Sequence, residues 1–217
     1  SNLTLNLSFL SSISTLLIDM DLNVVPLFSS PLVVKKLDQS LNIGKDIEKF
    51  SDLRKDRDAY RCLDDYPEDK RTILDVFHEF SKNTLGLENQ KFKISTSWVT
   101  KTTAGNPPGG LHCHKNSYYS GVFYFSEGEG FAPLIFDNLS NDRHFFFVPK
   151  HNVESGDPVI ANTFHALPPQ KNLLLFFPSY LSHAIGKHES AVTRYSLAFN
   201  VIPKGEIGFN DSTVTIK

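Results

Sequence analysis

The sequence predicts a mostly β domain, built as a sandwich or a barrel, with helices confined to the first part of the chain. From residue 91 onward, short apolar and alternating runs are separated by turns rich in Gly and Pro, a pattern typical of such folds. Before residue 91, apolar residues recur with a period of about 3.6, as on one face of a helix. The 217 residues are 40% hydrophobic and 12% aromatic, which allows one domain with a substantial core.

The first part of the chain contains one expected strand and two expected helices. Residues 31–37 read as a strand because they are rich in Leu and Val. Residues 39–58 and 71–87 each place apolar side chains on one helical face, and the second helix is expected to end near Gly86. Residues 59–70 are charged and contain a Tyr-Pro pair, so we expect them to form the loop between the helices.

The N-terminal end differs in amino-acid composition from the rest of the chain. Residues 1–19 are rich in Ser, Leu and Asn and lack the positively charged segment of a signal peptide. Because Met20 is the only methionine, we expect residues 1–19 to be a tail or upstream translation, and residues 20–217 to be a single domain. Within that domain we expect three parts: a strand with helices over 20–90, a β core over 91–203 and a C-terminal tail over 204–217.

The alternation in residues 91–102 predicts the first strand of the β core, with Phe92, Ile94 and Trp98 on one face. Residues 103–110 contain several Gly and Pro and are expected to form a loop. Further strands are expected over residues 118–126, 132–137, 144–148, 158–161, 172–177 and 193–201.

A His-x-His motif follows that loop. On a strand, the period of two places the imidazoles of His112 and His114 on the same face, which supplies half of a site for a first-row metal. His183, much later in the chain, is the expected third ligand. The other histidines lack such spacing and are expected to be surface or polar packing residues: His78, His144, His151, His165 and His188.

Arg194 begins a second alternating run. Arg194, Ser196 and Asn200 share one face of the expected strand, and this face is small and polar enough to line a cavity. A guanidinium binds a carboxylate through two parallel hydrogen bonds, and the hydroxyl of Ser196 can add a third. The pattern therefore predicts a carboxylate-binding group on the strand that follows the third histidine.

Charge and cysteine content limit the possible partners. The formal net charge is -2, with 22 basic and 24 acidic residues, so the basic excess typical of nucleic-acid binding is missing. The apolar stretches are too short to predict a membrane span. Cys62 and Cys113 do not form a disulfide framework, and we expect a reduced protein in the cytoplasm or another intracellular compartment.

The chain from about Val25 to Pro203 resembles the 2-oxoglutarate/Fe(II)-dependent oxygenase superfamily. The resemblance rests on Pro26–Pro31, Trp98, His112-Cys113-His114 with Asn116, Ser120–Tyr124, Leu175–Ser179 before His183, and Arg194–Asn200. More narrowly, the chain resembles a small group of uncharacterised oxygenases of bacteria and marine phages. In that group His often stands where the wider superfamily has Asp, as His114 does here.

The resemblance implies a double-stranded β-helix, or cupin-like jelly roll, with the N-terminal helices packed on one sheet. It implies Fe(II) held by His112, His114 and His183, and 2-oxoglutarate held by Arg194 and Ser196. It also implies an enzyme that hydroxylates its substrate with O2 and converts 2-oxoglutarate to succinate and CO2.

Several polar residues are expected around these groups. A metal-bound imidazole needs an acceptor for its other N–H, and Asn116, Ser120, Tyr124 and Asn200 are the candidates for this role and for cofactor binding. Asp137 is a reserve carboxylate that would replace His114 as third ligand if its strand turned it inward.

Two other functions fit the same residues. A cupin-like dioxygenase would use the three histidines, iron and O2 without 2-oxoglutarate, and Arg194 would then bind a substrate carboxylate. A non-catalytic module would use the metal only to stabilise a jelly roll. The substrate and the oligomeric state are not predicted by any motif.

Overall fold

The computed structural model describes residues 30–50, 60–137 and 164–217. The chain divides into two units, Ser1–Ser30 and Pro31–Lys217, and only the second is described below. Several expectations lie outside the described residues: the tail 1–19 with Met20, the end of the helix 39–58, the strands 144–148 and 158–161, and His144 and His151.

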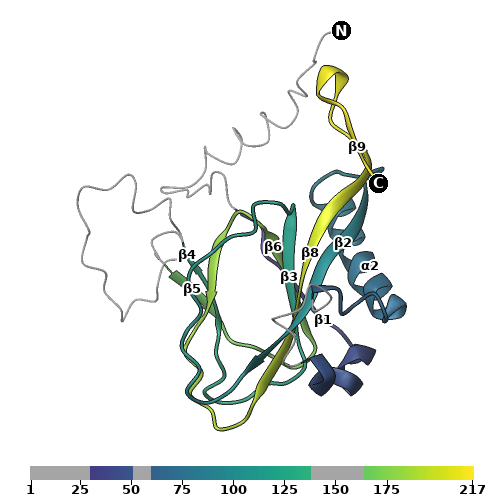
Figure 1. Ribbon diagram of the computed structural model, residues 1–217. Coiled ribbons are helices and arrows are strands. Elements are labelled where there is room, and N and C mark those ends of the chain that lie inside the picture. Colours follow the sequence, from purple (N-terminus) through teal and green to yellow (C-terminus); the bar gives the residue numbers. More distant parts are fainter. Residues whose placement is uncertain (1–29, 51–59, 138–163) are drawn as a thin grey trace, which may run out of the picture. The chain divides into compact units, whose positions relative to one another are not determined.

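The described residues form two antiparallel sheets, so the predicted mostly β fold is confirmed (Figure 1). The larger sheet has the order β1-β6-β3-β8-β2, and the smaller has the order β5-β4-β7. The strands of the larger sheet are β1 (Val33–Lys36), β2 (Lys91–Thr102), β3 (Tyr119–Tyr124), β6 (Leu173–Pro178) and β8 (Arg194–Ile207). Those of the smaller sheet are β4 (Leu134–Asp137), β5 (Phe164–Leu167) and β7 (Ser182–Ile185). The chain passes back and forth between the sheets, as in a double-stranded β-helix.

Alternate residues of the larger sheet contribute to two different cores. On β6, Leu174 and Phe176 pack in a core with helix residues, whereas Leu175 and Phe177 pack in a core with Leu134 of the smaller sheet. The second core therefore lies between the sheets, inside the jelly roll. Burying apolar side chains on both faces explains why β6 reads as a continuous apolar run.

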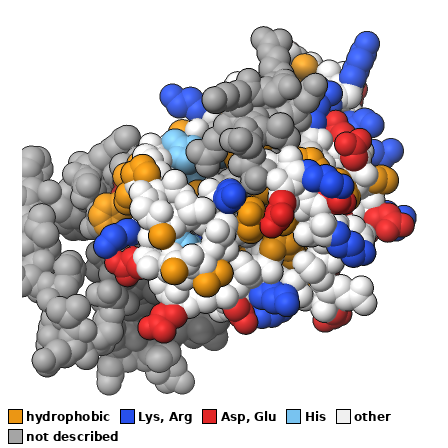
Figure 2. Space-filling model, turned by 60° about the horizontal axis from the view of Figure 1, so that its bottom comes forward, with side chains coloured by type: hydrophobic (Ala, Val, Ile, Leu, Met, Phe, Trp, Pro, Cys, Tyr) orange, Lys and Arg blue, Asp and Glu red, His pale blue; other side chains and the backbone are white. Residues whose placement is uncertain are grey.

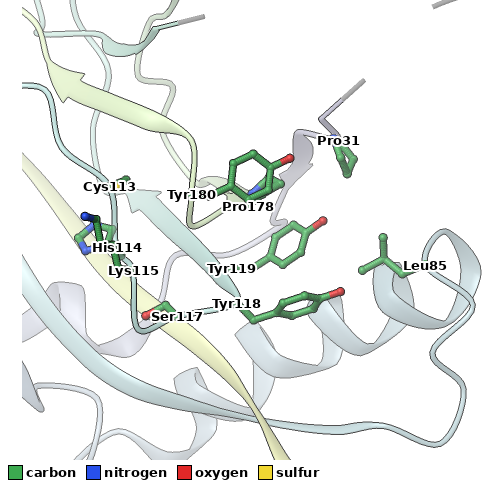
Figure 3. A pocket seen from close by; sticks show the side chains of 10 residues that line it. All are labelled: Pro31, Leu85, Cys113, His114, Lys115, Ser117, Tyr118, Tyr119, Pro178 and Tyr180. Atoms are coloured by element: carbon green, nitrogen blue, oxygen red, sulfur yellow. The ribbon is translucent and has the colours of Figure 1, made fainter. Parts of the chain in front are cut away.

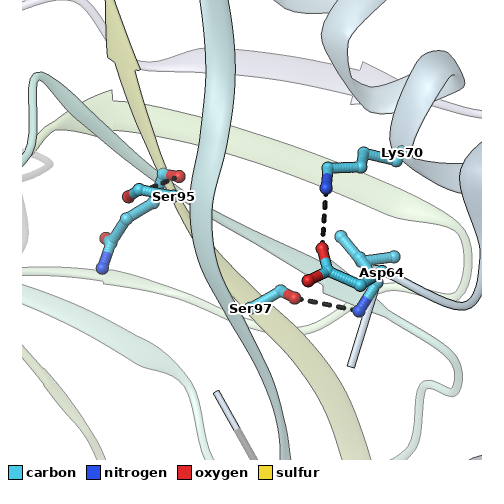
Figure 4. A network of polar contacts seen from close by, with 6 residues as sticks. Asp64, Lys70, Ser95 and Ser97 are labelled. Carbon is cyan, nitrogen blue, oxygen red and sulfur yellow. Dashed lines mark hydrogen bonds and ion pairs between the residues drawn. The ribbon is translucent and has the colours of Figure 1, made fainter. Parts of the chain in front are cut away.

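A β-bulge changes the side on which the residues of β2 lie. The register with β8 shifts between Ile94 and Thr96, so Ile94 and Val99 both face the helix-side core. Ser97 lies on that outer side as well, where its Oγ accepts a hydrogen bond from Leu63 N at 3.0 Å (Figure 4). The predicted common face of Ile94 and Trp98 is therefore wrong, because an extra residue in a strand inverts the alternation beyond it.

The helical layer covers the outer face of the larger sheet, as predicted. Helix α2 spans Pro67–Asn83 and lies beside β2 (Figure 1). It begins four residues before the predicted start, because a proline is well accommodated in the first turn of a helix. The 3-10 helix η1 (Asn42–Phe50) replaces the first part of the predicted helix 39–58. The carboxylate of Asp69 accepts hydrogen bonds from Asn42 N and Ile43 N, which ties η1 to α2.

Residues 204–217, expected to be a tail, contain further structure. Strand β8 continues to Ile207, and β9 (Val214–Ile216) pairs back onto it. None of the helices in the described ranges has the length and the apolar character needed to cross a membrane. On the face shown in Figure 2, Lys and Arg side chains are interspersed with Asp and Glu side chains.

Candidate metal centre

Backbone pairing brings the His-x-His motif to the third histidine. His112 and His183 form an isolated antiparallel bridge, with His112 N to His183 O at 3.0 Å and His183 N to His112 O at 2.9 Å. His114 is fixed by its own backbone N–H, which donates to Ser179 O at 2.9 Å. The motif itself is not a regular strand, yet the segment with His112 extends the smaller sheet beyond β7.

The three imidazoles converge. One ring nitrogen from each of His112, His114 and His183 lies within 4.8 Å of the other two. The ring centroids are 4.5 Å apart for His112 and His183, 5.1 Å for His114 and His183, and 5.2 Å for His112 and His114. Three neutral imidazoles facing one point make a donor set suited to a first-row divalent metal. The residues therefore fit a metal ion.

Backbone carbonyls set the tautomers of two of these rings. His112 Nδ1 lies 2.8 Å from Gly110 O, and His183 Nδ1 lies 2.9 Å from Leu181 O. A carbonyl oxygen only accepts hydrogen bonds, so each Nδ1 carries the proton and each Nε2 is left with a lone pair. In both cases the acceptor is two residues before the histidine. The predicted acceptors Asn116, Ser120, Tyr124 and Asn200 do not fill this role for either ring.

The site favours uncharged imidazoles. Burial lowers the pKa of His183 to about 4; the Leu181 carbonyl opposes this shift, and the nearby His112 and His114 add to it. Burial and the neighbouring His112 also lower the pKa of His114. Because metals bind the neutral ring, these shifts keep His114 and His183 ready for a metal at neutral pH.

Aromatic side chains hold the rings of His183 and His114. The His183 ring lies 4.7 Å from the Phe177 ring and 6.3 Å from the Phe136 ring, both in or beside the core between the sheets. The His114 ring lies 5.8 Å from the Trp98 ring. His183 is buried, His114 is half-buried and His112 is exposed, so the centre lies at the edge of the interior.

Arg194 lies on the interior face of β8, as predicted. It pairs in register with Thr102 and is two residues from Ser196, which pairs with the interior residue Tyr124. Arg194 is 1% exposed, its Nη1 donates to Thr102 Oγ1 at 3.2 Å, and its Cζ lies 5.0 Å from the Tyr124 ring centroid. Sequence reasoning missed Thr102, because the cross-strand register that pairs it with Arg194 is not visible in either strand alone.

Two buried polar atoms beside Arg194 are unsatisfied. Among the described residues, Arg194 Nε and the Tyr124 hydroxyl have no partner with good hydrogen-bond geometry, although the two side chains interact with each other, and Arg194 has no ion pair. Burying a donor without an acceptor is costly, so such a pair indicates a missing ligand with acceptor oxygens. A carboxylate of 2-oxoglutarate fits this requirement. Ser196 is buried on the same face.

A second polar network lies behind His114. Asn200 Oδ1 accepts from Ser120 Oγ at 2.8 Å, and Asn200 Nδ2 donates to Thr96 Oγ1 at 2.9 Å. Ser120 Oγ also lies 2.8 Å from the hydroxyl of Ser179, whose carbonyl holds His114. Asn200 and Ser120 thus support the backbone of His114 rather than any ring nitrogen.

Asn116 is not brought to the centre. It is exposed in the turn after His114.

Register also separates Asp137 from the centre. Phe136 pairs with His183, so the next residue, Asp137, lies on the opposite face of β4. The cluster of possible ligands found in the described residues does not include it. His165 also pairs with Phe136 and therefore lies on the same face as His183, although it is exposed and outside the cluster.

The two remaining described histidines have packing roles. His188 is 4% exposed; its Nδ1 accepts from Ala132 N, and its Nε2 donates to Val192 O. His78 packs its ring against Phe92 at 5.8 Å.

Residues 96–200 match the model of a protein family described as "Putative 2OG-Fe(II) oxygenase". The matched segment contains His112, His114, His183 and Arg194. A search of curated proteins finds no match. Among solved structures, the non-heme alpha ketoglutarate-dependent carbocyclase SnoK from nogalamycin biosynthesis is similar, with a TM-score of 0.53 and 10% identity over 79% of each chain.

Two further solved structures resemble the chain less well. HygX from Streptomyces hygroscopicus, with nickel and 2-oxoglutarate bound, gives a TM-score of 0.48 and 13% identity over 79% of this chain and 81% of its own. An oxidoreductase of the 2OG-Fe(II) oxygenase family from Burkholderia pseudomallei gives a TM-score of 0.41 and 13% identity. That match covers 60% of this chain and 56% of the Burkholderia chain.

The likeness to SnoK shows a shared fold. The matched segment, just under half of the chain, contains the histidine cluster and Arg194.

Proposed function

We propose that the protein hydroxylates its substrate by Fe(II)- and 2-oxoglutarate-dependent chemistry. His112, His114 and His183 hold the metal, and Arg194 with Tyr124 holds the distal carboxylate of 2-oxoglutarate. The observation that supports this assignment best is the buried Arg194 guanidinium, which has no acidic partner in the described residues and faces the same interior as His183. When bound, iron and 2-oxoglutarate supply the oxidation: one atom of O2 enters the substrate as a hydroxyl group, and the other enters succinate as CO2 leaves.

The chain's own residues have three tasks in this proposal. The carbonyls of Gly110 and Leu181 keep Nε2 of His112 and His183 available as ligand atoms. Arg194 and the Tyr124 hydroxyl orient the co-substrate by a charge-assisted hydrogen-bonded contact. Phe177 and Phe136 exclude water from the interior side of His183.

The neutral ligand set has an electrostatic consequence. With His114 in place of an acidic residue, the protein contributes no negative charge to the metal, which keeps its full double positive charge. An anionic chelator such as 2-oxoglutarate is then attracted more strongly than at a site with a carboxylate ligand. We also propose an intracellular, reducing location, supported by the free thiols of Cys62 and Cys113.

Titration calorimetry of the metal-loaded protein with 2-oxoglutarate, under anaerobic conditions, tests the proposal. Arg194→Ala should weaken 2-oxoglutarate by about 2–5 kcal/mol, because it leaves a carboxylate unpaired in a partly dry pocket. Tyr124→Phe keeps the packing and should cost about 1 kcal/mol for one hydrogen bond. Arg71→Ala, an exposed position on α2, is the matched control and should bind like wild type.

Metal binding separates the alternatives. All of these variants should retain the metal, because neither Arg194 nor Tyr124 is a ligand. Equal affinity for 2-oxoglutarate in wild type and in both variants would refute the role of Arg194 and favour the cupin-like dioxygenase. A protein that binds metal tightly but no 2-oxoglutarate at all would favour the non-catalytic module.

A further inference from the structure

A groove of about 530 Å³ runs outward from the metal centre along the rim of the larger sheet. His114 lines one end, and the other lining residues follow in a row toward the end of α2 (Figure 3). Most of the lining is aromatic or apolar: Tyr118, Tyr119, Tyr180, Pro31, Pro178 and Leu85. His114 belongs both to the groove lining and to the cluster of ligands, so one end of the groove adjoins the proposed metal centre.

The tyrosine rings of the groove are held in place by the protein. Tyr119 is buried, with its ring 5.3 Å from Phe77 and 5.5 Å from Phe80 of α2. Tyr118 lies parallel to Phe92, with a ring-to-ring distance of 6.0 Å and an angle of 7°. Binding to such preorganised rings loses little side-chain entropy, which favours affinity.

The hydroxyl and ammonium groups of the groove can all donate hydrogen bonds, and Lys115 can only donate. Burial raises the pKa of Tyr119 to about 12 and also raises the pKa of Tyr118, so both phenols keep their protons at neutral pH. Lys115 is the one charged side chain among the described lining residues, which include no carboxylate and no side-chain amide. The groove therefore suits a ligand that presents acceptors and a negative charge.

The exposure of the groove indicates that its ligand is a segment of another polypeptide and not a small molecule. Tyr118 is 41% exposed and Tyr180 is 68% exposed, so a bound molecule remains open to solvent on one side. Small-molecule sites instead bury about 70–90% of their ligand. Open aromatic grooves are characteristic of binding to polyproline II segments.

A proline-rich segment matches this chemistry most closely. In the polyproline II conformation the backbone makes no internal hydrogen bonds, so its carbonyls are free to accept. Proline contributes an acceptor without a donor, and its ring packs on aromatic faces. Donors in the groove would meet acceptors of the segment, and Lys115 would meet an acidic side chain.

We propose that the groove binds an extended, proline-rich peptide segment that contains an acidic residue, and that this segment belongs to the substrate. The claim that the groove binds such a peptide depends only on the lining of the groove. The claim that this peptide belongs to the substrate rests on the proposed oxygenase function. It requires that the peptide residue next to His114 extends beyond the groove and reaches the iron.

Fluorescence anisotropy with the full-length, metal-free protein tests the binding. The probe is a fluorescein-labelled polyproline peptide with one Glu, compared with a Gly-Ser peptide of equal length and charge. The proline-rich probe should bind at least about tenfold more tightly. Tyr118→Phe should weaken it about fivefold, as expected for one lost hydrogen bond.

Controls for this experiment come from the same chain. Tyr195→Phe, outside the groove lining, should bind the probe like wild type. Lys115→Gln should weaken the Glu-containing probe several-fold and leave a Gln-containing probe unchanged. Because Tyr118 is exposed, Tyr118→Phe should melt at the wild-type temperature. Equal binding of both peptides, or wild-type affinity in all groove variants, would overturn the proposal.

Succinate release by the Fe(II)-loaded protein separates the two parts. If the peptide binds and accelerates succinate release in wild type but less in Tyr118→Phe, the groove is a substrate site. If the peptide binds but 2-oxoglutarate is never consumed, the groove assignment stands and the oxygenase function fails. If succinate is released while no peptide binds, the oxygenase function stands and the groove proposal fails.

Discussion

Acid should destabilise the metal-free protein through His183. Burial lowers the pKa of His183 from its usual 6.5 to about 4. Above pH 6.5 neither the folded nor the unfolded chain binds a proton there, so the fold has its full stability. Below pH 6.5 the unfolded chain takes up a proton that the folded chain resists until about pH 4. Stability contributed by the neutral His183 is therefore lost as the pH falls from 6.5 to 4.

The size of this loss follows from the pKa shift. Each pKa unit corresponds to about 1.4 kcal/mol, so a shift from 6.5 to about 4 corresponds to about 3 kcal/mol. That is a large fraction of the roughly 5–15 kcal/mol by which a typical domain is stable. His183 is only 6% exposed, so solvent screening reduces the effect little.

Urea unfolding in the presence of EDTA measures the effect, with fluorescence of the single tryptophan, Trp98, as the signal. The free energy of unfolding is measured between pH 7 and pH 4 for wild type and His183→Gln, because the difference between them removes the contribution of other groups. The difference should shrink or reverse toward pH 4. Arg71→Ala, at an exposed position on α2, serves as a control and should follow wild type. Wild-type and His183→Gln curves that stay parallel over the whole range would refute the reasoning.

Two further substitutions test the site and the fold. His114→Asp should retain metal binding, because a carboxylate at this position completes a two-histidine, one-carboxylate set. His114→Ala should lower the affinity for the metal at least about tenfold. Calorimetry with Mn²⁺ would measure both affinities, and loss of metal binding in His114→Asp would contradict a ligand role. Gly121→Ala should lower the free energy of unfolding by about 1–3 kcal/mol, since its new Cβ would lie 2.3 Å from the Phe199 ring and 2.7 Å from Leu175 O. Adding Phe199→Leu should recover part of that loss in urea unfolding, and an unchanged Gly121→Ala variant would show that the strand can move aside.

Patterns within a single strand were predicted well. The bounds of β2 and the face of β8 that carries Arg194 follow from alternation, and the convergence of the histidines follows from spacing and the resemblance. These features depend on local periodicity, which a sequence displays directly.

Features that depend on neighbouring strands were not predicted. The bulge near Thr96 inverts the face of Trp98 without any sign in the composition of β2. Strands β5, β7 and β9 were missed because, unlike the equally short β1 and β4, none contains two adjacent large apolar side chains. The acceptors for the histidine rings are main-chain carbonyls, and every residue type has one, so no side chain marks Gly110 or Leu181 in the sequence.

The direct backbone pairing of His112 with His183 makes a bound metal sensitive to strand alignment. A shift of β7 by one residue would turn His183 to the outer face and bring Ser182 or Ala184 inward instead. Neither of those side chains is an effective metal ligand. The complete three-histidine set therefore forms only after the two segments have met in the native alignment, and an ion bound there joins parts of the chain separated by residues 113–182. A metal bound to this set therefore favours the native strand alignment, because misaligned chains do not gain the binding energy of the three-histidine site.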